Sequence, residues 1–119
     1  MLNLNRAVPV LALMATFALA APAAELEGLL MDKMCSAKVA SEGVKAAKMH
    51  TRDCALMPNC VSSGFGVVTA DGKFHPLDAK GNEKAEAALK ASKKKDDLRV
   101  KVTGEQEDAA FRVVSLKLL

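Results

Sequence analysis

The sequence predicts a small, mainly β domain of the α+β class: five short strands, a helical insert after the first, and one helix between the third and the fourth. An Asp71-Gly72 turn separates two apolar runs, and Asp-Gly in that setting is the strongest short hairpin signal. Apolar and polar residues alternate over 98–103, which is typical of a half-buried strand. A segment over 82–92 begins with a capping residue and is followed by lysines, as expected of a helix.

The first half of the domain contains three predicted strands and the insert. Residues 26–32 form a short apolar run and predict the first strand. Residues 36–53 are rich in Ala, Lys and Met and predict helix. Gly43 should bend or split this helix, because glycine in a helix interior costs about 1 kcal/mol relative to alanine. Residues 64–70 and 73–77 are the two arms of the Asp-Gly hairpin.

The second half contains one helix and two further strands. Pro76 lacks the N–H that a sheet ladder needs, so the second hairpin arm is predicted to be an edge strand or to end there. Residues 78–82 predict a turn, and Asn82 is the expected cap of the helix that follows. The last two strands are predicted at 98–103 and 111–116, joined by a polar turn.

The order strand, helical insert, strand, strand, helix, strand, strand is that of a small five-stranded barrel of the oligonucleotide/oligosaccharide-binding (OB) type. An open sheet with two helices packed on it has the same order. The short strands and the two hairpins favour the OB-like barrel. A domain of this size holds one modest core. We expect five residues in that core: Val67, Leu89, Val100, Val102 and Phe111.

A series of short motifs runs along the chain. They are Gly28-x-x-x-Asp32, a Cys/His segment, Gly64-Phe-Gly-Val-Val, Asp71-Gly-Lys-Phe and a closing Val102-Thr-Gly104 hairpin. The series covers nearly all of the chain after its leader and resembles small exported bacterial proteins of uncharacterised function. The resemblance implies an OB-like fold and carries no activity, so no functional residue is transferred from it.

Residues 1–24 have the composition of a cleavable secretory signal peptide. Arg6 supplies a positive charge, the apolar run that follows covers about 14 residues, and small residues then provide an Ala-x-Ala cleavage site. The run is shorter than the roughly 20 residues that a membrane span needs. We therefore expect cleavage after Ala23 or Ala24, with cleavage after Ala20 as the alternative. The mature domain, residues 25–119, is expected to lack a transmembrane segment and to be periplasmic or secreted.

Three cysteines and one histidine form the candidate functional cluster, with the spacing Cys35-x14-His50-x3-Cys54-x5-Cys60. On a helix, His50 and Cys54 would share one face, with their Cβ atoms about 5–6 Å apart. Three thiols and one imidazole are a complete tetrahedral ligand set for zinc. Thioethers add a copper(I) alternative, because soft sulfur ligands favour that ion. Three methionines stand beside or between the cluster residues: Met34, Met49 and Met57.

A second interpretation of the cluster needs no metal. Cysteines of exported proteins usually pair, and three cannot all pair within one chain. A disulfide with one free cysteine would then make the protein a purely structural or envelope-interaction domain. The Cys-x5-Cys spacing also differs from that of zinc ribbons. Two functions therefore stay open: an exported binding module with a zinc or copper(I) site in its insert, and a disulfide-stapled domain.

Composition and motifs disfavour two other classes. The formal net charge is only +3, and loss of Arg6 with the leader lowers it further, which is too little to indicate a nucleic-acid partner. Aromatic residues make up 3% of the chain and leave no platform for stacking bases. The chain has no Cys-x-x-Cys pair, no haem-attachment motif and no phosphate-binding glycine loop. No catalytic constellation is assembled, so an enzyme is the least favoured class.

Overall fold

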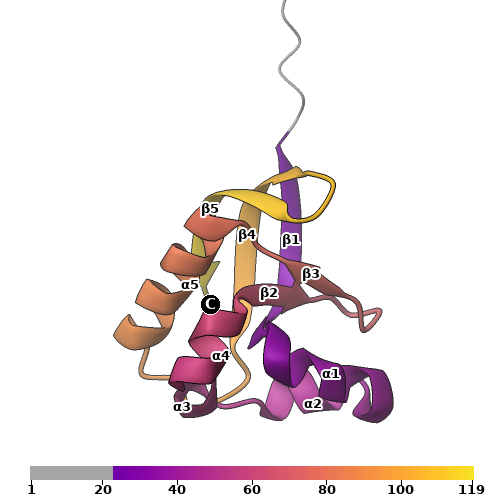
Figure 1. The fold of residues 1–119 in the computed structure, drawn as a ribbon, viewed down its shortest axis with the longest axis vertical. Helices are drawn as coiled ribbons and strands as arrows, with labels where there is room; N and C mark the ends of the chain where they lie inside the picture. The colour runs from indigo at the N-terminus through magenta and orange to yellow at the C-terminus, as the bar shows by residue number, and fades with distance from the viewer. Residues whose placement is uncertain (1–22) are drawn as a thin grey trace, which may run out of the picture.

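The structure of this chain, a computed structural model, describes residues 23–119 (Figure 1). Residues 1–22, which hold nearly all of the predicted signal peptide, lie outside the described residues. In chain order the elements are β1 (Ala24–Asp32), α1 (Lys33–Glu42), α2 (Val44–Met49), α3 (Arg52–Ala55), α4 (Pro58–Ser63), β2 (Phe65–Val68), β3 (Phe74–Pro76), α5 (Ala79–Ala91), β4 (Arg99–Gln106) and β5 (Phe111–Leu118). Among the described residues, no helix combines the length and the apolar character needed to cross a membrane.

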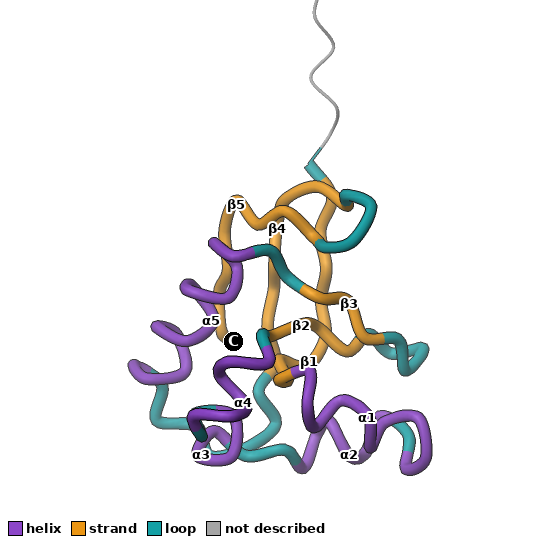
Figure 2. The backbone as a smooth tube through the Cα atoms, in the orientation of Figure 1, coloured by secondary structure: helices purple, strands orange, loops and turns teal. Residues whose placement is uncertain are grey.

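The five strands form one antiparallel sheet in the order β3-β2-β1-β4-β5. β1 lies in the middle: Leu30 pairs with Val67 of β2, and Leu26 pairs with Val102 of β4. The helix α5 covers one side of this sheet, and the helices α1 to α4 gather at the end where β1 finishes (Figures 1 and 2). The predicted α+β class with five strands is confirmed, in the form of an open sheet with several helices.

The two outer strands of the sheet come together at one point. β3 is an edge strand, which agrees with the expectation drawn from Pro76. Leu77, just after β3, forms an isolated parallel bridge with Phe111 at the start of β5. The next residue, Asp78, donates its backbone N–H to the carbonyl oxygen of Phe111 at 3.0 Å. These contacts hold the start of α5 against β5.

The main core lies between the sheet and α5. All five residues that the sequence predicted to be buried are buried. The full cluster consists of Leu30, Ala55, Phe65, Val67, Leu77, Ala85, Leu89, Leu98, Val100, Val102, Phe111 and Val113. At roughly 1.5–3 kcal/mol for each fully buried large apolar side chain, this cluster is the main source of the stability of the domain.

The central strand β1 is buried on both faces. Successive side chains of a strand point to opposite faces, so Leu30 enters the main core while Leu29 and Met31 face the other way. There they meet Val39 of α1 and Ala47 of α2 in a second, smaller cluster. This double burial fixes the end of β1, and therefore Asp32, between the sheet and the helical insert.

The helix α5 begins earlier than predicted. It starts at Ala79, and Asp78 is its cap, with a carboxylate oxygen that accepts from the backbone N–H of Gly81 at 2.9 Å. The turn expected at 78–82 is therefore wrong. Gly81, within that stretch, is buried in the helix, where an added Cβ would lie 2.5 Å from a methyl group of Val113. The glycine allows close packing of α5 on β5 rather than a turn.

Asn82 does not cap α5 but joins that helix to the sheet. Its side-chain oxygen accepts from the backbone N–H of Phe65, the first residue of β2, at 2.8 Å. The cap expected at this residue is therefore wrong, although the helix itself is present. The sequence separation between the two partners, 17 residues, is why local capping rules could not reveal this bond.

The insert is a set of four short helices rather than one bent helix. Gly43, with a φ of 77°, ends α1 and starts α2, so the predicted break at this glycine is confirmed. Thr51 begins α3, because its hydroxyl accepts from the backbone N–H of Cys54 at 3.1 Å. Pro58 starts α4 at a position that suits proline. Each boundary thus has a local chemical cause.

Candidate metal centre

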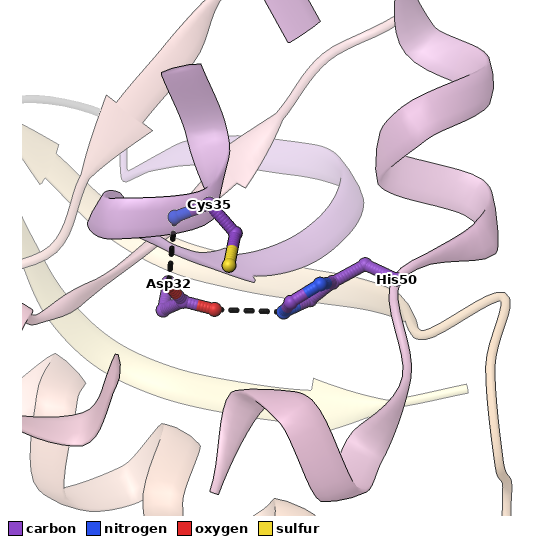
Figure 3. A group of neighbouring side chains, drawn as sticks. All are labelled: Asp32, Cys35 and His50. Carbon is purple, nitrogen blue, oxygen red and sulfur yellow. Dashed lines mark hydrogen bonds and ion pairs between the residues drawn. The ribbon is translucent and has the colours of Figure 1, made fainter. Parts of the chain in front are cut away.

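The site is built around Asp32, at the junction of β1 and α1. Its side chain is completely buried, and it caps α1 by accepting the backbone N–H of Cys35 at 2.9 Å. Aspartate is one of the preferred residues at this position of a helix. The cap sets the direction of the first turn of α1 and brings the Cys35 side chain back over the carboxylate (Figure 3).

His50 contacts the second carboxylate oxygen of Asp32. Its Nε2 lies 2.7 Å from Oδ1, and the imidazole points from the end of α2 toward the carboxylate (Figure 3). His50 is 8% exposed, so the contact is shielded from water. Both oxygens of Asp32 therefore have partners, as a buried carboxylate requires.

Cys35 completes a group of three potential metal ligands. One carboxylate oxygen of Asp32, the sulfur of Cys35 and an imidazole nitrogen of His50 all lie within 4.8 Å of one another. Carboxylate, thiolate and imidazole are the ligand types that zinc uses in proteins. Cys35 is only partly buried, so the group can be reached from solvent.

Cys60 approaches the same group from α4. It is 5% exposed, and its thiol lies near enough to Cys35 and Asp32 for both to affect its pKa. Two bonds support the position of α4 beside α1. The backbone N–H of Met34 donates to Ser63 Oγ at 3.2 Å, and Ser63 Oγ donates to the carbonyl oxygen of Cys60 at 2.7 Å. The site thus gathers a carboxylate, an imidazole and two thiols.

The electrostatics of the group keep its thiols protonated. Burial, together with the negative charge of Asp32, raises the pKa of Cys35 to about 12. Burial and the same carboxylate also raise the pKa of Cys60. Burial acts to raise the pKa of Asp32 as well, but the hydrogen bonds from His50 and from the Cys35 backbone outweigh it and hold that pKa below its usual value. A protonated thiol is a poor nucleophile, whereas a bound metal ion would displace its proton.

Three of the four residues predicted from the sequence come together, and one does not. Cys35 and His50 form one group with Asp32, Cys60 is buried nearby on α4, and Cys54 is exposed on α3. The expectation that His50 and Cys54 share a helix face is wrong, because the chain is extended at His50 and Thr51 starts a new helix. All three cysteines are free thiols.

Asp32 is absent from the residues predicted to form the site. It comes at the end of an apolar run, where it was assigned to the first strand. One local signal could have found it: an aspartate three residues before Cys35, at the start of a helix, is an expected N-cap. Its contact with His50, 18 residues away, had no signal in the sequence.

Comparisons of the chain with models of known protein families, with curated proteins and with solved structures find no match. The fold and the site define the class: a small α+β domain with an Asp-Cys-His group where β1 meets the helical insert. The chemistry of that group is therefore what indicates a function.

Proposed function

We propose that this protein is a small exported binding module that holds one zinc ion in its helical insert, through Asp32, Cys35, His50 and Cys60. The observation that carries this proposal is the approach of a carboxylate oxygen, a thiol and an imidazole nitrogen to within 4.8 Å of one another. Cys60, which is buried on α4 and near enough to Asp32 and Cys35 for both to affect its pKa, would supply the fourth ligand of a tetrahedral set.

The ligand set favours zinc over copper(I). A carboxylate is a hard oxygen ligand, which zinc accepts readily, whereas copper(I) prefers thiolate and thioether sulfur. The methionines that suggested copper have mostly exposed side chains, with Met34 at 54%, Met49 at 63% and Met57 at 54%. Copper(I) remains the alternative for a site in which these thioethers replace the carboxylate.

The zinc proposal is tested by titration of the reduced, metal-free protein. We expect one zinc per chain by native mass spectrometry, and cobalt substitution should give the absorption bands of a tetrahedral thiolate site. His50→Ala should weaken zinc binding by more than roughly 100-fold, beyond the 10–100-fold that loss of an outer contact costs. Cys54→Ser is the matched control and should bind as the natural chain does. Equal loss in both variants, or binding of copper(I) alone, would contradict the proposal.

A second candidate function is a structural or envelope-interaction domain stapled by a disulfide. The bonds that tie the start of α1 to the last turn of α4 favour it, because they bring Cys35 and Cys60 close together, as a disulfide requires. Cys54, on the surface, would then be the free cysteine. Thiol counting on the protein as isolated from its own host decides between one and three free thiols per chain.

We also propose that the sheet closes into an OB-like barrel. The supporting observation is the parallel bridge between Leu77 and Phe111, which brings the end of β3 beside the start of β5. Contact between the third and fifth strands is what closes such a barrel. Amide exchange tests this proposal: the N–H groups at this junction should be as protected as those of β1.

Export to the periplasm or the exterior is proposed from the leader at residues 1–24. The first strand begins at Ala24, whose partner is Gly104 of β4, so cleavage after Ala23 would leave the described sheet complete. N-terminal sequencing of the protein from its own host should begin between Ala21 and Glu25. A soluble protein that keeps Met1 would contradict export.

A further inference from the structure

We propose that Cys35 and Cys60 make the zinc site redox-controlled: oxidation of the two thiols to a disulfide removes two of the four ligands and releases the ion. This inference rests on the proposed zinc function and adds its regulation. The disulfide joins these two sulfurs only, so Cys54 takes no part in the switch.

The backbone around the two cysteines is already arranged for a bond between them. The N–H of Lys33 donates to the carbonyl oxygen of Gly64 at 2.8 Å, and Met34 is bonded to Ser63, which is in turn bonded to Cys60. The start of α1 is thus tied to the last turn of α4. Because these bonds hold the turns that carry Cys35 and Cys60 side by side, and each thiol affects the pKa of the other, a disulfide can form without a large movement of either helix.

Loss of the metal would not leave an unpaired charge in the insert. In this structure, one oxygen of Asp32 is bonded to His50 at 2.7 Å, and the other accepts the backbone N–H of Cys35 at 2.9 Å. A buried carboxylate with two partners is stable without an ion. The insert can therefore stay folded in the metal-free, oxidised state, which a switch requires.

The chemistry needs a disulfide oxidant, for which oxidised glutathione is the probe. The sulfur of Cys35, the more exposed of the two, attacks the oxidant and forms a mixed disulfide while one glutathione thiol leaves. The sulfur of Cys60 then attacks the Cys35 sulfur of that mixed disulfide, and the second glutathione thiol leaves. The protein sulfurs lose two electrons, which reduce the oxidant's disulfide. Two protons from water complete the two glutathione thiols, and the zinc ion departs unchanged.

The test treats the zinc-loaded protein with oxidised glutathione and follows free zinc with pyridylazoresorcinol. We expect release of one zinc per chain, in step with a Cys35–Cys60 disulfide found by peptide mass spectrometry. Dithiothreitol should restore zinc binding. Cys54→Ser should behave in the same way, because its thiol lies outside the pair. Circular dichroism checks that the oxidised protein remains folded.

Two results would overturn the switch while leaving the zinc function intact. One is an oxidised protein that contains the Cys35–Cys60 disulfide and still holds zinc. The other is oxidation that joins Cys54 to either partner instead. If the reduced protein binds no zinc at all, the proposed function itself fails and the switch fails with it. Because peptide mapping is done on the natural chain, the answer does not depend on whether a Cys60→Ser variant folds.

Discussion

The sheet with α5 and the helical insert are stabilised in different ways. The sheet packs large apolar side chains from four of its five strands into one cluster, which includes Phe65 and Phe111. The insert adds few buried apolar residues of its own: Val39, Ala47, Ala55 and Cys60. Its four helices are shorter than the roughly 12–15 residues below which isolated helices are marginal. The insert therefore depends on its caps and on the buried Asp32–His50 pair.

Substitutions in the main core and substitutions in the polar group should therefore differ in how much of the domain they destabilise. A cavity in the main core affects the packing of every strand, so the whole domain loses stability together. A change in the polar group affects a region whose apolar contacts are few, so local opening comes first.

The largest effect is expected from Phe111→Ala. This side chain is 1% exposed and lies in the main core, and deletion of a buried phenylalanine costs about 3–5 kcal/mol. Chemical denaturation followed by circular dichroism should show one cooperative transition at a lower midpoint. Loss of the insert with an unchanged transition of the sheet would contradict the comparison.

His50→Ala should weaken the insert and leave the sheet folded. The substitution removes a hydrogen bond to a charged, buried carboxylate, which is worth about 1.5–3 kcal/mol. Amide exchange should accelerate over residues 33–63, while the amides of β1 and β4 keep their protection. His75, the other histidine, is the matched control. It bonds to Thr69 in the hairpin, and His75→Ala should change stability by less than about 0.5 kcal/mol.

Acid should loosen the insert before the sheet. The pKa of Asp32 is lowered in the folded protein, so the stability that this carboxylate contributes is complete above the unfolded value of about 3.9. That contribution is lost as the pH falls below about 4 and through the folded pKa. Asp32→Asn keeps a capping oxygen and should abolish this part of the acid sensitivity. An unchanged acid profile in Asp32→Asn would show that other carboxylates dominate.

The smallest effect is expected from Cys54→Ser. The side chain is exposed, and the bond at this residue is made by its backbone N–H to Thr51, which the substitution keeps. Stability should change by less than about 0.5 kcal/mol, and exchange over the insert should stay as it was. Destabilisation as large as that of His50→Ala would place Cys54 in the site after all.

The expected strands agree with the structure where a local pattern decided them. The alternation over 98–103 and the Asp71-Gly72 turn both identified their elements, since a period of two and a tight turn depend only on near neighbours. The start of α5 was expected too late in the chain, because the stretch 78–82 contains Gly81 and a glycine can have two structural roles. Glycine is equally typical of a turn and of close packing, and only contact with β5 distinguishes them.

By itself, the sequence determined the order of the elements, five residues of the core and the region in which the candidate site lies. These follow from periodicity and from residue types that act over a few positions. Only the tertiary structure decided that Asp32 is the centre of the group and that Cys60 rather than Cys54 joins it. The reason is physical: Thr51 and Pro58 redirect the chain between short helices, so the direction of each side chain depends on how those helices pack against α1 and the end of β1.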